Sequence, residues 1–350
     1  MSARTDGLEL RKQRWRAFLS PNAAPQRLLV VNFTQDEIDE PRPWPDKAAE
    51  RVEWAWIHYN RQMERLDWVH DDTVPYLWVH TGTEIFAEAF GCEVYRPEHT
   101  APSARPFVRT PGQAARVRVP DIGAGPLATL FEMADELHRR AGNGAVFRLV
   151  DIQSPMDIAA LIWDKSTFFT AVLEAPDAVR ELAHKVQELL CAFLDEWFRR
   201  YGADFVAHYP DYYMTHGITL SADEIGSVSA LTFDALFLPE LVELSNRYGQ
   251  IGIHSCANSR HQWESIKKIP DLRLLNLVQP YPVIQEAYCF FANHTAHMHF
   301  WPEADTQGAP WVNGHPSDAR IAFQVTAKSG EEARRLSEQF AEGRAASGLD

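Results

Sequence analysis

The chain has 350 residues, of which 45% are hydrophobic, and it carries a formal net charge of −14 at pH 7. This content suffices for a large core, in two domains or in one α/β barrel with insertions. The acidic balance and the lack of a long Lys/Arg run argue against partners such as duplex nucleic acid or an anionic membrane surface.

The chain contains no segment with the apolar length of a membrane-spanning helix, and its first eighteen residues lack the apolar core of a secretory signal. Its four cysteines, Cys92, Cys191, Cys256 and Cys289, are too few and too scattered for a disulfide framework. We therefore expect a reduced, cytoplasmic protein.

Taken in order, the chain alternates between short apolar runs and segments with one apolar stripe at helical spacing. Residues 1–25 read as a charged helix and a Pro-containing loop, an extension preceding one domain over 26–350. Strands are expected at 27–33, 74–80, 146–150, 205–208, 218–220, the run leading to His254, 272–278, 296–301 and 319–325. Helices are expected at 46–67, 85–90, 126–140, 177–201, 233–248, 262–268 and 331–340. Residues 93–120, rich in Pro and Arg, read as an insertion that covers one end of the fold.

Alternation of this kind predicts a parallel sheet with right-handed crossovers. About eight candidate strands in one chain favour an α/β fold of the (β/α)8 TIM-barrel type, with its N-terminal helical extension, over a doubly wound sheet.

Polar residues collect where the expected strands end, and in this barrel those ends form the active face. Asp151, Asp223 and Glu224 are the candidate catalytic carboxylates. The candidate substrate-binding residues are Asn32, His80, Gln153, His208, Asp211 and Gln279. The alternative is that loops after strands are polar in any case, and Asp157 and Asp177 are assigned to helix starts for that reason.

The segment QIGIHSCANS at residues 250–259 predicts the centre of the site. Side chains two apart on a strand point the same way, so His254 and Cys256 would project together from one strand end. Imidazole and thiolate are both zinc ligands, which predicts a metal site. A packed cysteine beside a hydrogen-bonded histidine is the alternative.

Several stretches together resemble the uroporphyrinogen decarboxylase superfamily over roughly residues 75–345. They are FAEAFGCEVY at 86–95, LVDIQSPMDIAALIW at 149–163, EAPDAVRELAHKV at 174–186, RRYGADFVAHYPDYY at 199–213 and the long segment 216–280 that contains HSC. The resemblance implies a (β/α)8 barrel, and the superfamily also contains zinc-dependent methyltransferases that act on corrinoid proteins and thiols.

The resemblance implies two chemistries. True uroporphyrinogen decarboxylases carry an Arg-bearing loop of the form RQAGRY after the first strand, whereas this chain has the acidic NFTQDEIDEPRPWP there. Such a loop would repel a substrate with many carboxylates, so we expect no decarboxylation of uroporphyrinogen.

The methyltransferase branch carries His-x-Cys on a late strand, matched by His254 and Cys256, and a further Cys near the last strand, which is absent here. A catalytic zinc needs three protein ligands. The candidates for the third ligand are Asp223, Glu224, Cys289, His297 and His299, although the last two could equally be surface histidines.

The leading hypothesis is therefore an enzyme of this superfamily, a zinc-dependent methyltransferase acting on a thiol or a corrinoid-linked methyl group. Its partners would be a small-molecule substrate and a corrinoid protein, with no nucleic acid and no membrane. One alternative is a metal-free decarboxylase (a carboxy-lyase) in which Asp223 or Asp211 stabilises a cationic intermediate. The other is a barrel that binds a small molecule without catalysis.

Overall fold

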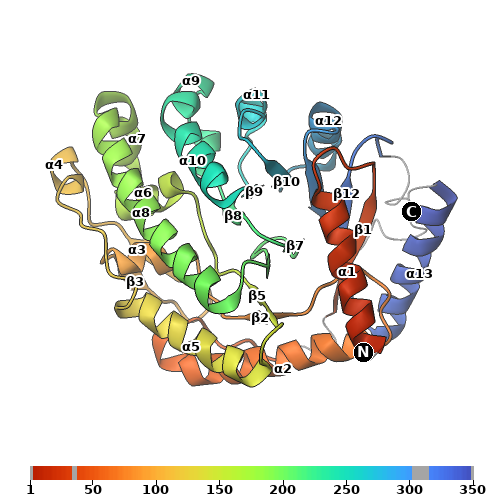
Figure 1. The fold of residues 1–350 in the computed structure, drawn as a ribbon. Coiled ribbons are helices and arrows are strands. Elements are labelled where there is room, and N and C mark those ends of the chain that lie inside the picture. The colour runs from red at the N-terminus through yellow and green to blue at the C-terminus, as the bar shows by residue number, and fades with distance from the viewer. Residues whose placement is uncertain (1–2, 34–37, 302–314, 348–350) are drawn as a thin grey trace.

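A computed structural model describes residues 3–33, 38–301 and 315–347, and its main strands form two sheets inside a ring of helices (Figure 1). The larger sheet is parallel throughout and consists, in spatial order, of β1 (Arg27–Phe33), β12 (Ile321–Ala327), β11 (Ala296–Phe300), β10 (Leu272–Leu277), β9 (Ile251–Ser255) and β8 (Ile218–Ser221). The smaller sheet consists of β2 (Tyr76–Trp78), β5 (Val146–Arg148), β6 (Phe205–Val206) and the antiparallel β7 (Tyr213–Met214).

The two sheets are joined on both sides of the larger sheet, which closes the barrel. On one side a parallel bridge pairs Gln153, just past β5, with Ser221 at the end of β8. On the other side the backbone N–H of Asp72, ahead of β2, donates to the Leu29 carbonyl of β1 at 2.7 Å. The predicted (β/α)8 fold class is confirmed.

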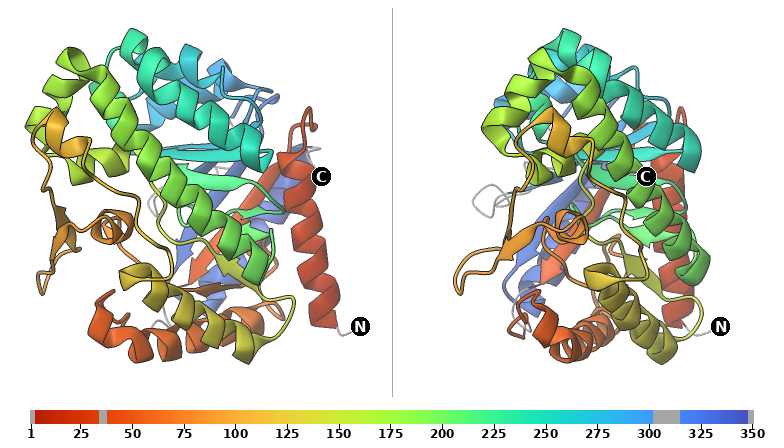
Figure 2. Two further views of the ribbon diagram at one scale, coloured as in Figure 1. Left: turned by 60° about the vertical axis from the view of Figure 1, so that its left-hand side comes forward. Right: turned by 90° about the vertical axis from the view of Figure 1, so that its left-hand side faces the viewer.

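Side-chain carboxylates complete this second seam, between β1 and β2. The N–H groups of Leu29 and Val31 donate to the carboxylates of Asp72 and Asp71, at 3.0 and 2.9 Å. Helix α1 (Ala3–Leu19) packs against this seam and reaches across to β7, and its Arg11 pairs with Asp71 at 2.6 Å (Figure 2). Asp71 and Asp72 thereby replace part of a backbone ladder and tie α1 to the barrel wall.

Helices surround the strands. In chain order they are α2 (Ala48–Arg65), α3 (Ile85–Ala89), α4 (Pro111–Ala114), α5 (Gly125–Ala141), α6 (Pro155–Ile162), α7 (Lys165–Glu174), α8 (Pro176–Tyr201), α9 (Ala230–Thr232), α10 (Leu238–Tyr248), α11 (Trp263–Ile266), α12 (Tyr281–Phe291) and α13 (Gly330–Ser347). None of the helices in the described part of the chain is both long enough and apolar enough to cross a bilayer.

Alternate residues of the strands face the barrel interior and the helices, as the period of two requires. On β1, Leu28 and Val30 belong to the main core, whereas Leu29, Val31 and Phe33 pack in a second cluster beneath α13. The interior is filled below the mouth. There a Cβ on Gly252 would meet the Tyr212 hydroxyl, which is hydrogen-bonded to Thr219 at 2.6 Å.

Most differences from the expected elements lie in short segments. The residues around 93–120 contain a small hairpin of β3 (Glu93–Tyr95) and β4 (Ser103–Arg105), followed by α4. Helices α6, α7 and α12 were not expected. Ser154, whose hydroxyl accepts from the N–H of Asp157, followed by Pro155, is a helix-start signal that would have indicated α6. The helix expected at 262–268 is shorter, with a 3-10 turn over 260–262 followed by α11.

Candidate active-site cavity and metal centre

A cavity of about 390 Å³ opens at the carboxyl ends of the barrel strands. It is lined by Trp78, His80, Thr81, Thr83, Asp151, Gln153, His208, Tyr209, Ser221, Asp223, His254, Cys256 and Val278. Seven of the residues singled out from the sequence lie around it: His80, Asp151, Gln153, His208, Asp223, His254 and Cys256.

The other four predicted residues lie elsewhere. Asn32 and Asp211 line an adjoining cavity, and Gln279 lies at the rim, where its side-chain amide donates to the Cys256 carbonyl at 3.0 Å. Glu224 is turned toward α7 and pairs with Lys165 at 2.6 Å. Asp223 and Glu224 thus face different ways, as expected, although the segment is a 3-10 turn over Glu224–Ser227 and not an extended chain.

Asp223, His254 and Cys256 form a cluster of possible metal ligands at one side of the cavity. Each offers one ligand atom, and the three atoms lie within 4.8 Å of one another. The His254 Nε2 and Cys256 Sγ atoms are 3.1 Å apart. Asp223 is one of the candidate third ligands named from the sequence, and it comes from the loop after β8.

The loop that carries Asp223 is held by its neighbours. The buried Asp157 carboxylate at the start of α6 accepts from the backbone N–H groups of Asp223 and Glu224, at 2.6 and 3.2 Å. The Asp223 carboxylate in turn accepts from the Cys256 N–H at 2.6 Å. Asp157 is therefore a helix-start residue, as expected, and it also fixes the backbone of Asp223, the candidate third ligand.

Asn276 on β10 orients His254. Its amide nitrogen donates to the Met298 carbonyl at 2.7 Å, so its oxygen faces His254 and accepts from Nδ1–H at 2.5 Å. That arrangement places the proton of neutral His254 on Nδ1 and leaves the Nε2 lone pair directed at Cys256. Burial lowers the pKa of His254, which favours this neutral, ligating form.

The other candidate ligands lie away from the cluster. His297 and His299 of β11 are 2% and 8% exposed and pack against the Tyr288 ring of α12. The alternative that they are surface histidines is wrong, because their side of β11 is covered by α12 while Met298 faces the barrel core. Cys289 is exposed on α12.

Asp151 and His208 form a second polar pair across the cavity. The His208 Nε2 atom lies 3.4 Å from the Asp151 carboxylate and 3.1 Å from the Ser221 hydroxyl. Burial, and then the nearby Glu84 carboxylate, raise the pKa of Asp151 to about 7. Burial and the Arg148 charge lower the pKa of His208 to about 3, so its ring is neutral at physiological pH.

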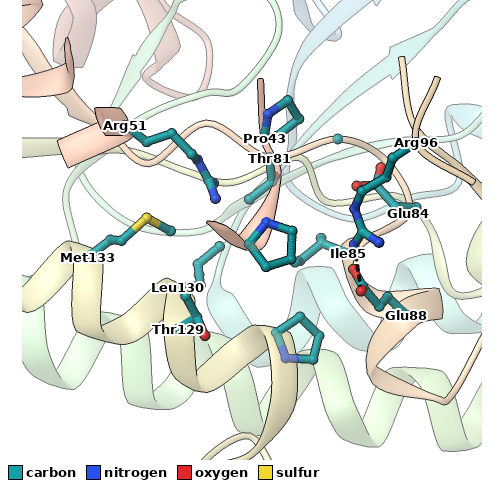
Figure 3. A pocket seen from close by; sticks show the side chains of 13 residues that line it. Pro43, Arg51, Thr81, Glu84, Ile85, Glu88, Arg96, Thr129, Leu130 and Met133 are labelled. Carbon is teal, nitrogen blue, oxygen red and sulfur yellow. Dashed lines mark hydrogen bonds and ion pairs between the residues drawn. The ribbon is translucent and has the colours of Figure 1, made fainter. Parts of the chain in front are cut away.

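A much smaller cavity, of about 40 Å³, adjoins Thr81 (Figure 3). The Arg51 guanidinium points into it from one side, and Arg96 and Glu88, paired at 2.6 Å, close the other. Arg51 also donates to the His80 carbonyl and so holds the end of β2. This space suits a water molecule rather than a substrate.

The sequence reading missed Trp78, Tyr209 and Asn276. Asn276 had a visible signal, a polar residue inside the apolar run LRLLNL. Tyr209, whose ring stands edge-on to His254 at 4.7 Å, had none.

A closed (β/α)8 barrel with a polar cavity and three possible metal ligands at the carboxyl ends of its strands has the architecture that barrel enzymes share. The family model for uroporphyrinogen decarboxylase (URO-D) matches residues 79–277, more than half of the chain, and the chain belongs to this family.

Among solved structures, a methyltransferase from Methanosarcina mazei is similar at 11% identity, covering 96% of this chain and 98% of that one, with a TM-score of 0.64. That likeness shows the fold. A Bacillus subtilis mannanase matches at 9% identity over 94% of this chain and 90% of that one, with a TM-score of only 0.39. A search of curated proteins gave no match.

Proposed function

We propose that this protein is a metal-dependent methyltransferase that binds zinc through Asp223, His254 and Cys256. The observation that carries the proposal is the cluster of three donors from two neighbouring loops, with His254 already oriented by Asn276. A nitrogen, a sulfur and a carboxylate oxygen suit zinc, and three protein ligands leave a position for substrate. When bound, zinc would act as a Lewis acid that favours the deprotonated form of a substrate thiol.

The protein's own groups would prepare the site for this chemistry. Asn276 keeps the His254 Nε2 unprotonated, and the Asp157 carboxylate holds the Asp223 backbone in place. Asp151, whose pKa lies near neutrality, can accept the proton that a thiol substrate gives up on binding. The methyl donor would be a corrinoid carried by a partner protein in the cytoplasm.

The metal-free decarboxylase alternative is less favoured by the contacts of Asp211. Its carboxylate already pairs with the Arg148 guanidinium at 3.0 Å, so it is not a spare negative charge for a cationic intermediate. Asp223 could still take that role without a metal.

Zinc content distinguishes the zinc-dependent methyltransferase from the two metal-free alternatives. The protein, expressed without a His-tag, should contain about one zinc per chain by elemental analysis, and Cys256→Ser should lose it while remaining folded, because a hydroxyl is a far poorer zinc ligand than a thiolate. Cys289→Ser is the matched control, since that cysteine is exposed on α12 away from the cluster, and it should keep the metal. A wild-type protein that binds no zinc in a chelator competition would refute the proposal and leave the two metal-free alternatives.

A further inference from the structure

A second cavity, of about 310 Å³, lies beside the first and shares Trp78 and Tyr209 with it. It is lined by Val31, Asn32, Phe33, His58, Gln62, Arg65, Thr73, Tyr76, Trp78, Arg148, Tyr209, Asp211, Gln324 and Thr326. The two cavities therefore meet at Trp78 and Tyr209, and the Tyr209 ring, which contacts His254, places the second cavity beside the candidate metal centre.

A buried ion pair forms the floor of this second cavity. Arg148 donates to the Asp211 carboxylate at 3.0 Å, to the Tyr76 hydroxyl at 3.1 Å and to the His208 carbonyl, and its guanidinium lies 4.2 Å from the centre of the Trp78 ring. The two charges offset each other, so the floor attracts neither a cation nor an anion strongly.

Two acceptor atoms on this floor are poorly satisfied. Gln324 is 3% exposed, its amide nitrogen reaches Asp211 only at 3.5 Å, and its oxygen has no hydrogen-bond partner in the described part of the chain. The same Asp211 oxygen receives one other contact, from the Tyr76 hydroxyl at 3.3 Å. A buried acceptor without a donor is unfavourable, and a ligand that brings N–H groups would correct this.

Neutral and aromatic groups form other parts of the wall. The His58 Nδ1 atom lies 2.8 Å from the Gln62 amide nitrogen, which donates to it, and burial lowers the pKa of His58 to about 4, so the ring is neutral with its proton on Nε2. Trp78 and Tyr209 also line this cavity, and because Arg148 already lies over one face of the Trp78 ring, the Tyr209 ring is the main surface on which a flat group can stack. Tyr209 is 39% exposed and touches His254, so a group stacked on Tyr209 lies next to the candidate metal centre.

We propose that this second cavity binds the non-reacting part of the substrate, and that this part is a planar, uncharged group with an N–H donor pair, such as a primary amide on an aromatic ring. The donor pair meets the Gln324 and Asp211 oxygens, and the ring stacks on Tyr209. This inference rests on the proposed function at one point, because it takes the bound molecule to be the substrate of the neighbouring candidate metal centre.

Nicotinamide and nicotinate test the chemistry, because they have the same shape and differ in amide against carboxylate. Titrated calorimetrically into the full-length protein, nicotinamide should bind at least about 10-fold more tightly than nicotinate. Gln324→Leu should remove most of that preference and leave zinc content unchanged. Gln187→Leu is the matched control, because Gln187 is also 3% exposed with an unpartnered amide oxygen, but lies on α8.

Comparing the two ligands on the wild-type protein tests the preference for an uncharged group even if Gln324→Leu does not fold. Binding of nicotinate as tight as that of nicotinamide would show that the cavity takes an anion through Arg65 and Arg148, and would overturn the proposal. So would the absence of binding by both, or an unchanged preference in a folded Gln324→Leu variant. A protein that shows the preference but binds no zinc would refute the proposed function alone.

Discussion

Replacing Asn276 tests whether zinc binding needs the orientation of the His254 ring as well as the histidine itself. Asn276 is 2% exposed and makes two hydrogen bonds, one from His254 Nδ1–H at 2.5 Å and one to the Met298 carbonyl at 2.7 Å. Asn276→Leu removes both, and Asn276→Asp keeps an oxygen facing His254 but cannot donate to Met298. The difference between the two variants isolates the bond to His254.

Loss of a partner that orients a metal-bound histidine lowers metal affinity by about 10- to 100-fold, which corresponds to about 1.4 to 2.8 kcal/mol. We expect that loss in Asn276→Leu, and zinc affinity close to wild type in Asn276→Asp. Both variants should lose about 1 to 3 kcal/mol of stability, because the Met298 carbonyl is left buried without a donor.

Zinc affinity is measured by competition with a chromophoric chelator, and thermal unfolding of the metal-free proteins reports the stability change. A folded Asn276→Leu protein that holds zinc as tightly as wild type would show that His254 does not depend on Asn276. Equal weakening in both variants would point instead to a general loosening around β10.

Two further predictions concern buried charges. Glu240 is 7% exposed, neither of its carboxylate oxygens has a partner in the described residues, and burial raises its pKa well above the usual value. The pKa of Glu240 is higher in the folded state than in the unfolded state, so stability is retained in acid and is lost as the pH rises from the unfolded-state pKa to the folded-state pKa. Glu240→Gln should therefore raise the free energy of unfolding by about 1 to 3 kcal/mol at pH 8 and by almost nothing at pH 4, as measured by urea unfolding. A gain of the same size at both pH values would count against a charged Glu240. Arg11→Ala should cost about 3 to 5 kcal/mol, because Asp71 keeps a buried charge without its partner, whereas the exposed Gln13→Ala on the same helix should change stability by less than about 0.5 kcal/mol. Equal thermal shifts in these two variants would contradict the role of Arg11 at the barrel seam.

The barrel and the position of the site could be predicted from the sequence because both follow from local patterns. Apolar runs followed by a polar residue indicate strand ends, and parallel strand ends meet at one mouth. His80, Asp151 and His254 each follow such a run, and they line the same cavity.

The remaining features depend on side-chain partners far apart in the chain. Asp223 could be named among five possible third ligands but not chosen, because its place is set by Asp157, 66 residues earlier. Arg148 lies within the short strand Val146–Arg148, and only the fold reveals that Asp211 meets it from another loop. The direction of the histidines on β11 was likewise open until α12 was known to cover them.

The register of β1 has a consequence for the order in which the chain folds. Arg27 lies opposite Ile321, so the edge of β1 that faces β12 must wait for the last strand before it pairs. At about 5 to 20 residues per second, the ribosome takes roughly 15 to 60 s to make that intervening chain. During this time the apolar segment RLLVVNF has an open edge of the kind that promotes aggregation. Arg11 and Asp71 are made early, however, so α1 can dock at once on Asp71 and Asp72, whose carboxylates hold the other edge of β1. The N-terminal helix would then secure one edge of a nascent strand while the other edge is still open, and we expect chains without it to demand more chaperone during synthesis.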